Sequence, residues 1–131
     1  MSKKIRWTPG TKKGLRELEE DIRVDFGYGL FLVQEGKDVS EIERAIDGLK
    51  IKQLGGYGAL VYEFKQRLDK DAYRCVYTVR FRGVVYVLHA FKKRSKSGIS
   101  LPKEDDNLIR EHLKWAEEHF RNHPEEDSDD N

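Results

Sequence analysis

The stretch LVYEFKQRLDKDAYRCVYTVRFRGVVYVLHAF, from Leu60 to Phe91, decides the fold of this chain. Apolar and polar residues alternate along it, and β-branched and aromatic residues are frequent, which predicts strands. Asp69-Lys70-Asp71 and Gly83 are turn residues that divide it into three. We therefore expect strands over Leu60–Leu68, Tyr73–Arg82 and Val84–Phe91. Because the connections are short, the three strands should form an antiparallel meander.

The alternation also assigns the two faces of the middle strand. Its odd-numbered positions should point into the core: Tyr73, Cys75, Tyr77, Val79 and Phe81. Arg74, Arg80 and Arg82 should then lie on the opposite face, with Arg67 of the preceding strand, and this face is expected to be open to solvent. On that placement Arg74→Ala should change stability by no more than about 0.5 kcal/mol. Tyr77→Ala should cost about 3–5 kcal/mol.

The sequence on either side of the meander predicts one further strand and three helices. A short strand is expected at Lys4–Thr8, one long helix from Thr11 to Gly36, a second helix over Glu41–Leu49 and a third from near Pro102. This order predicts an α+β fold: a twisted antiparallel sheet, made of the meander plus the N-terminal strand, with helices packed on one face. Residues 1–123 should form a single domain, and the acidic tail 124–131 should be disordered.

Bulk composition limits the class of protein. The chain has 131 residues, 37% hydrophobic and 37% charged, which is enough for one domain with a core. No apolar run approaches the about 20 residues of a membrane span, and the basic start lacks the apolar stretch of a signal peptide. The single Cys75 cannot form an internal disulfide. These features favour a cytoplasmic location.

Charge is unevenly distributed along the chain. The net charge is only +1, yet residues 72–98 contain seven bases and no acid: Arg74, Arg80, Arg82, Lys92, Lys93, Arg94 and Lys96. Residues 1–16 add six more bases without an acid. Such runs on a strand-rich segment indicate a surface that binds a polyanion.

The residue types present exclude several chemistries and leave one open. The four histidines show no metal-ligand spacing, no nucleotide-binding loop is present, and no cofactor is expected. Cations on a sheet can bind a phosphodiester and stabilise the charge of its transition state. Because RNA supplies its own nucleophile, the ribose hydroxyl, a metal-free ribonuclease needs only proton carriers beside such cations. Glu63, Tyr77 and His89 are candidates, although Glu63 also fits a cross-strand ion pair and His89 a core position.

Four segments resemble a known family. They are Asp25–Leu30 (DFGYGL), Tyr62–Arg67 (YEFKQR), Tyr73–Tyr77 (YRCVY) and Val87–Lys96 (VLHAFKKRSK). Together they resemble the RelE/HigB superfamily of toxin–antitoxin toxins, in its phage-associated, HigB-like branch. The resemblance implies a RelE-like fold and a small cytoplasmic toxin that cuts mRNA, usually on the ribosome, without a metal. It also implies a cognate antitoxin, often a helix-turn-helix protein.

The resemblance also assigns roles by position. Arg74 matches the strand arginine expected at the scissile phosphate, and Lys92, Lys93 and Lys96 match a basic loop. Arg67 matches the arginine of a Glu-Leu-Arg-like strand, although the spacing here is Glu-Phe-Lys-Gln-Arg. The predicted catalytic set is Arg74, Lys92, Lys93, Glu63, Tyr77 and His89. The predicted RNA-binding set is Arg67, Arg80, Arg82, Arg94 and Lys96.

A second class of function fits the same features. Some relatives act on DNA gyrase, and others have lost activity. The alternative is therefore a binding protein of the same fold that is not a nuclease, either a gyrase inhibitor or an inactive remnant.

Overall fold

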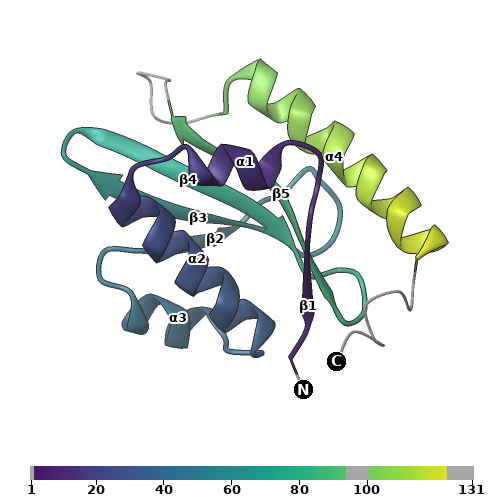
Figure 1. Ribbon diagram of the computed structural model, residues 1–131, viewed down its shortest axis with the longest axis horizontal. Coiled ribbons are helices and arrows are strands. Elements are labelled where there is room, and N and C mark those ends of the chain that lie inside the picture. The colour runs from purple at the N-terminus through teal and green to yellow at the C-terminus, as the bar shows by residue number, and fades with distance from the viewer. Residues whose placement is uncertain (1, 94–100, 124–131) are drawn as a thin grey trace.

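The computed structural model describes residues 2–93 and 101–123, which form a five-stranded sheet with four helices (Figure 1). The strands are β1 (Lys4–Trp7), β2 (Lys50–Gln53), β3 (Val61–Leu68), β4 (Asp71–Thr78) and β5 (Val84–Lys93). Their order across the sheet is β1-β5-β4-β3-β2. β2, β3, β4 and β5 pair antiparallel, and β1 runs parallel to β5. The predicted α+β class and the meander are therefore confirmed. The N-terminal strand joins the sheet as predicted, but it pairs parallel, so the sheet is mixed and not wholly antiparallel.

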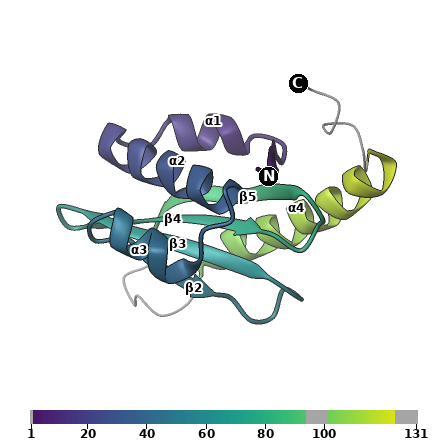
Figure 2. The same cartoon turned by 90° about the horizontal axis from the view of Figure 1, so that it is seen from below.

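The helices cover both faces of the sheet, not one. They are α1 (Thr11–Arg16), α2 (Glu20–Gln34), α3 (Val39–Ala45) and α4 (Lys103–Asn122). Figure 2 shows α1 and α2 on one side of the sheet and α4 on the other. The expectation of a second face open to solvent is thus wrong. α4 has an apolar stripe that includes Ile109 and Leu113. This stripe packs on Val76 and Leu88 of the second face of the sheet.

Two hydrophobic clusters hold these layers together. In the first, Phe26 and Leu30 of α2 pack on Phe64 and Tyr77, and all four are at most 2% exposed. In the second, the residues of α4 pack on the opposite face of the same strands. β4 and β5 are therefore buried on both faces, which explains the nearly continuous apolar run of β5.

The long N-terminal helix predicted from Thr11 to Gly36 is two helices. α1 ends at Arg16, and Glu19 is extended, with φ −56° and ψ 147°, before α2 begins. The break lets α1 lie against β5 while α2 lies against β3. The next helix, α3, begins at Val39, two residues before the predicted start at Glu41. Asp38 caps it by accepting a hydrogen bond from the Glu41 amide, as part of a capping box.

Two strand boundaries also differ from the sequence pattern. Lys50–Gln53, where no strand is predicted from the sequence, forms the edge strand β2 against β3. The middle strand ends at Thr78 instead of Arg82, after an irregularity between Val76 and Tyr77. Short edge strands carry little periodic signal, which is why β2 could not be recognised from four residues.

Gly29 is required where α2 crosses β3. A Cβ at this position would lie 2.7 Å from Cε2 of Phe64, whereas one at Gly27 would meet nothing within 4 Å. Gly29→Ala should therefore destabilise the fold by about 1–3 kcal/mol through overpacking. Gly27→Ala, on the same helix, should stabilise it by about 0.5–1 kcal/mol through helix propensity. Urea unfolding of the two variants measures both changes, and equal effects would contradict the close approach of α2 to Phe64.

Candidate functional site

Charged side chains gather on the half of the α4 face that α4 leaves uncovered. In the sheet, Lys50 pairs with Lys65, which pairs with Arg74, and Lys52 pairs with Glu63. In the next row Arg67 and Lys93 both pair with Ala72. Directly opposite residues share a face of a sheet. This row pattern therefore collects six bases and one acid on one surface: Lys50, Lys52, Lys65, Arg67, Arg74, Lys93 and Glu63.

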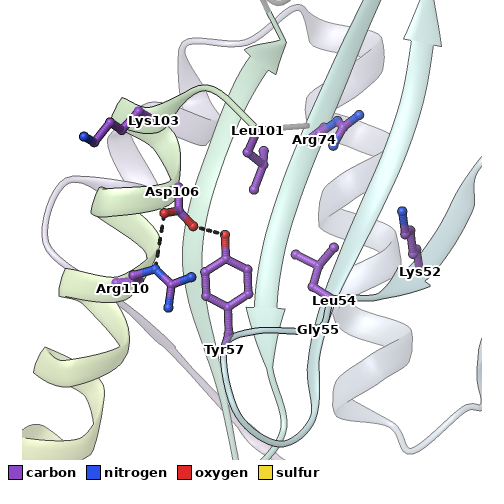
Figure 3. Close-up of a pocket in the computed structure, with 9 residues that line it drawn as sticks. All are labelled: Lys52, Leu54, Gly55, Tyr57, Arg74, Leu101, Lys103, Asp106 and Arg110. Atoms are coloured by element: carbon purple, nitrogen blue, oxygen red, sulfur yellow. Dashed lines mark hydrogen bonds and ion pairs between the residues drawn. The ribbon is translucent and has the colours of Figure 1, made fainter. Parts of the chain in front are cut away.

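A pocket of about 560 Å³ opens between this surface and the start of α4 (Figure 3). It is lined by Lys52, Leu54, Gly55, Tyr57, Arg74, Leu101, Lys103, Asp106 and Arg110. In Figure 3 the cations stand on opposite walls, with Lys52 and Arg74 on the sheet side and Lys103 and Arg110 on the helix side. Asp106 is the acid among the lining residues. The pocket is thus suited to an anion with apolar parts.

Arg74 is a buried cation with incomplete hydrogen bonding. It is 7% exposed, and its Nη1 donates to Oε2 of Glu63 at 2.8 Å, while Glu63 itself is 2% exposed. Its Nε is buried and has no hydrogen-bond partner among the residues that the structure describes. Burying a donor without a partner costs about 1–3 kcal/mol, and more when the group is charged. An anion that accepted a hydrogen bond from this Nε would remove the cost.

Lys93 lies among several other positively charged side chains. Desolvation and the neighbouring charges of Arg74, Lys65 and Arg67 lower the pKa of its ammonium, and Glu63 opposes them only in part. Like charges held close together disfavour the charged form of each. An anion bound among them should therefore raise the pKa of Lys93.

The wall of the pocket opposite Arg74 is held by a cluster centred on Tyr57. Its hydroxyl donates to Oδ1 of Asp106 at 2.5 Å, and Arg110 donates from Nε to Oδ2 of Asp106 at 3.2 Å and from Nη1 to the Gly56 carbonyl at 3.0 Å. The Arg110 guanidinium lies 4.6 Å from the Tyr57 ring centre. Burial and the bond to Asp106 raise the pKa of Tyr57, and that same bond lowers the pKa of Asp106. The loop before β3 is thus tied to α4.

The structure brings together only part of the predicted catalytic set. Arg74, Glu63 and Lys93 share the site described above. Lys92 points to the other face, where its Nζ lies 3.0 Å from Oδ2 of Asp71. Tyr77 is also on that other face, 2% exposed, with its ring centre 4.8 Å from that of Phe64, and burial raises its pKa.

His89 lies on the α4 face but under the helix. Its Nε2 is 2.7 Å from Oδ1 of Asp105, and its ring stacks on Phe91 with a centroid distance of 4.3 Å. Burial lowers its pKa despite the opposing effect of Asp105. It is therefore largely neutral at pH 7.

The predicted RNA-binding arginines separate in space. Arg67 joins the cationic surface at its exposed margin. Arg80 is 3.4 Å from Glu117 and donates to the carbonyls of Tyr57 and Ala59, so it ties the same loop to α4. Arg82 is exposed near the β4–β5 turn. Arg94 and Lys96, like the tail 124–131, lie outside the described residues.

Of the residues with polar side chains that line the pocket, sequence reasoning found Arg74 and missed the other five. They are Lys52, Tyr57, Lys103, Asp106 and Arg110. Two signals pointed to them: the alternating bases of Lys50-Ile51-Lys52, and Asp106 and Arg110 four apart on a helix. Neither signal indicates that the loop before β3 and helix α4, which are distant in sequence, form one wall of the pocket.

Stability should depend on pH through His89. Its folded-state pKa is below the unfolded value of about 6.5, so the unfolded chain binds the proton more tightly. The free energy of unfolding should therefore rise as pH increases from below the folded pKa to about 6.5, and level off above it. Urea unfolding at several pH values measures this slope, and His89→Asn should reduce it. An unchanged slope would assign the dependence to other groups.

Two searches of the described residues gave no sites. Between residues 2 and 93 and between 101 and 123, no three His, Cys, Asp or Glu side chains gather in an arrangement that could hold a metal ion. Over the same ranges, no helix is both long and apolar enough to cross a membrane.

Comparisons with known proteins agree on the fold and family. The profile of the family described as phage-derived protein Gp49-like (DUF891) matches residues 13–114, most of the chain. Among solved structures, an arginine-to-alanine mutant of E. coli toxin RelE in the free state is similar, with a TM-score of 0.53 and 20% identity over 87% of this chain and 97% of that one. No curated protein matches in sequence. The chain therefore belongs to the phage-derived Gp49-like family, and its fold is similar to that of the RelE toxin.

Proposed function

We propose that this chain is the toxin of a type II toxin–antitoxin system and cuts mRNA on the ribosome without a metal ion. The observation that carries the proposal is the buried Arg74, with an unpaired Nε, at the edge of a pocket with cations on both walls. Family membership supports the toxin class, and the site supports an anionic substrate. RNA fits this chemistry because its backbone is anionic at every residue and carries an internal nucleophile.

The reaction that fits these residues is transfer within the RNA. The ribose 2′-oxygen attacks the adjacent phosphorus, the bond to the 5′-oxygen breaks, and the products are a 2′,3′-cyclic phosphate and a 5′-hydroxyl. Arg74 would bind the non-bridging oxygens through Nε, and Lys93 would add a second positive charge. Both interactions strengthen as negative charge develops on these oxygens, which is how fixed cations lower the barrier.

Glu63 and His89 are assigned different tasks in this proposal. Glu63 is paired with Arg74 and almost fully buried, so it orients the guanidinium. His89 is held by Asp105 and is largely neutral at pH 7, which is the form that accepts a proton. We assign it as the proton carrier, which takes the proton from the attacking 2′-hydroxyl and gives it to the departing 5′-oxygen. Tyr77, on the other face, has no proton-transfer role.

The partners follow from the proposed class. A toxin of this kind requires a cognate antitoxin, which we expect to be a helix-turn-helix protein. The ribosome would supply the mRNA in single-stranded form. The bases Lys50, Lys52 and Lys65, exposed or half-buried beside the pocket, would contact the RNA backbone on either side of the cleaved bond.

Expression of the chain alone in bacteria, followed by mapping of 5′-hydroxyl mRNA ends, tests the proposal. We expect growth arrest and new ends within coding sequences. Lys93→Gln should reduce both by about tenfold or more, a loss of at least about 1.4 kcal/mol of transition-state stabilisation. Arg82→Gln removes an equal charge from the exposed segment between β4 and β5, where Arg82 does not line the pocket, and should change neither.

Two other outcomes would contradict cleavage. A DNA damage response with intact transcripts would favour a gyrase inhibitor of the same fold. Normal growth with intact transcripts, at confirmed expression, would indicate an inactive remnant.

A further inference from the structure

Helix α2 has an apolar side that the fold does not use. Val24 is 60% exposed, Tyr28 47% and Phe31 49%. Spacings of four and three residues place them on one stripe, and the rings of Tyr28 and Phe31 stack with centroids 6.3 Å apart. The opposite side of the same helix, which includes Phe26 and Leu30, is buried on the sheet. A contiguous exposed apolar surface of this kind marks a contact with another molecule.

A groove adjoins this stripe. Its volume is about 730 Å³, and it lies between α2, the turn from α3 to β2 and the end of β3. Val24 and Tyr28 form part of its lining. The charged residues that line it are four acids and one base: Glu20, Asp21, Asp25, Asp47 and Arg67. The surface therefore combines apolar contacts with a net negative charge.

The charge selects the kind of occupant. An RNA backbone would be repelled by these carboxylates. A second copy of the chain presenting the same surface would bring its own carboxylates against them, at a cost for each like-charge contact. A segment with an apolar stripe flanked by lysine or arginine satisfies both features at once, in the manner of a helix laid in a groove.

We propose that the α2 surface, defined as Val24, Tyr28, Phe31 and the acidic groove beside them, docks a basic amphipathic segment of a partner protein. The apolar side chains of the partner lie on the stripe, and its cations lie against Glu20 and Asp21. Helix α2 and the cationic pocket are on opposite faces of the sheet (Figure 2), and Arg67, at the margin of the sheet, is the one groove residue that also belongs to the cationic surface. The partner therefore leaves the pocket open, and both can be occupied together.

A labelled helical peptide of leucine and lysine, with leucine at every third or fourth position, is the probe. Its binding to the full chain is measured by fluorescence anisotropy at several salt concentrations. Val24→Ser/Phe31→Ser and Glu20→Gln/Asp21→Asn should each weaken binding by about tenfold or more, or about 1.4 kcal/mol. Affinity should also fall with salt, because exposed charges are screened.

Matched controls separate this surface from general attraction. Val39→Ser removes a half-exposed apolar residue from α3, and Glu111→Gln/Glu118→Gln removes two charges from α4. Both control variants should bind the peptide with unchanged affinity. The α2 variants should in turn bind RNA as well as the unmodified chain does. Amide shifts in an NMR titration should cluster on residues 20–31.

Three results would overturn the proposal. One is equal binding of a scrambled peptide of the same composition. Another is equal binding to the α2 variants. The third is a dimer in sedimentation that Phe31→Ser dissolves, which would make a second copy the occupant.

Discussion

Arg74→Ala should lower the free energy of unfolding by about 3–5 kcal/mol and abolish RNA cleavage. The substitution leaves the Glu63 carboxylate buried without its partner. An uncompensated buried charge lowers the free energy of unfolding strongly. This reverses the sequence-based expectation of a neutral change, because Arg74 is 7% exposed and is paired with a buried carboxylate instead of lying on an open surface. Urea denaturation measures the stability, and transcript-end mapping measures the cleavage.

A double variant separates the two effects. Glu63→Leu/Arg74→Met replaces both charges with apolar side chains of similar length, a change that is often neutral for stability. We expect it to recover most of the lost free energy and to remain inactive. If this variant cleaves RNA, Arg74 has no part in the reaction.

Tyr77→Ala should destabilise the protein by about 3–5 kcal/mol, whereas Tyr77→Phe should retain cleavage. The ring is 2% exposed and packs on both Phe64 and Tyr62, so its removal empties the first hydrophobic cluster. The hydroxyl has no task in the proposed reaction, because it lies on the face of the sheet opposite the pocket. Thermal or urea unfolding and transcript-end mapping of the two variants provide the measurements.

Phenylalanine at this position serves as the control for a catalytic role. If the Tyr77→Phe protein is fully stable but no longer cuts RNA, the Tyr77 hydroxyl takes part in proton transfer. It would also require a path from the α2 face to the substrate.

The meander was predictable because its signal is local. Alternation from Leu60 to Phe91 and the turns at Asp69 and Gly83 fix three strands, and the structure keeps them with small shifts at their ends. The position of α4 was not predictable in this way. The outward residues of β4 include Val76 and Thr78 as well as Arg74, and the two non-arginines are fully buried under α4.

The site was recoverable only in part for a related reason. Arg74 and Glu63 lie on predicted strands, so their common face follows from register. Lys93 lies two residues beyond the predicted end of the last strand, and only the structure extends β5 to it. Tyr57 and Arg110 lie on a loop and a helix 53 positions apart in number, and only the packed structure brings the ring and guanidinium together. Tyr77 was chosen as a proton carrier from its residue type and Lys92 from its family position, and strand parity places both on the other face.

The most direct test of the central claim observes the Nε–H of Arg74 by NMR. The probe is a short RNA whose 2′-hydroxyls are methylated, so that it binds without being cut. If the pocket holds the scissile phosphate, this resonance should shift and its exchange with water should slow, because the buried Nε–H gains the acceptor that it lacks in the free protein. If the RNA binds while the Arg74 resonance stays unchanged, the phosphate lies elsewhere and the proposed site is wrong.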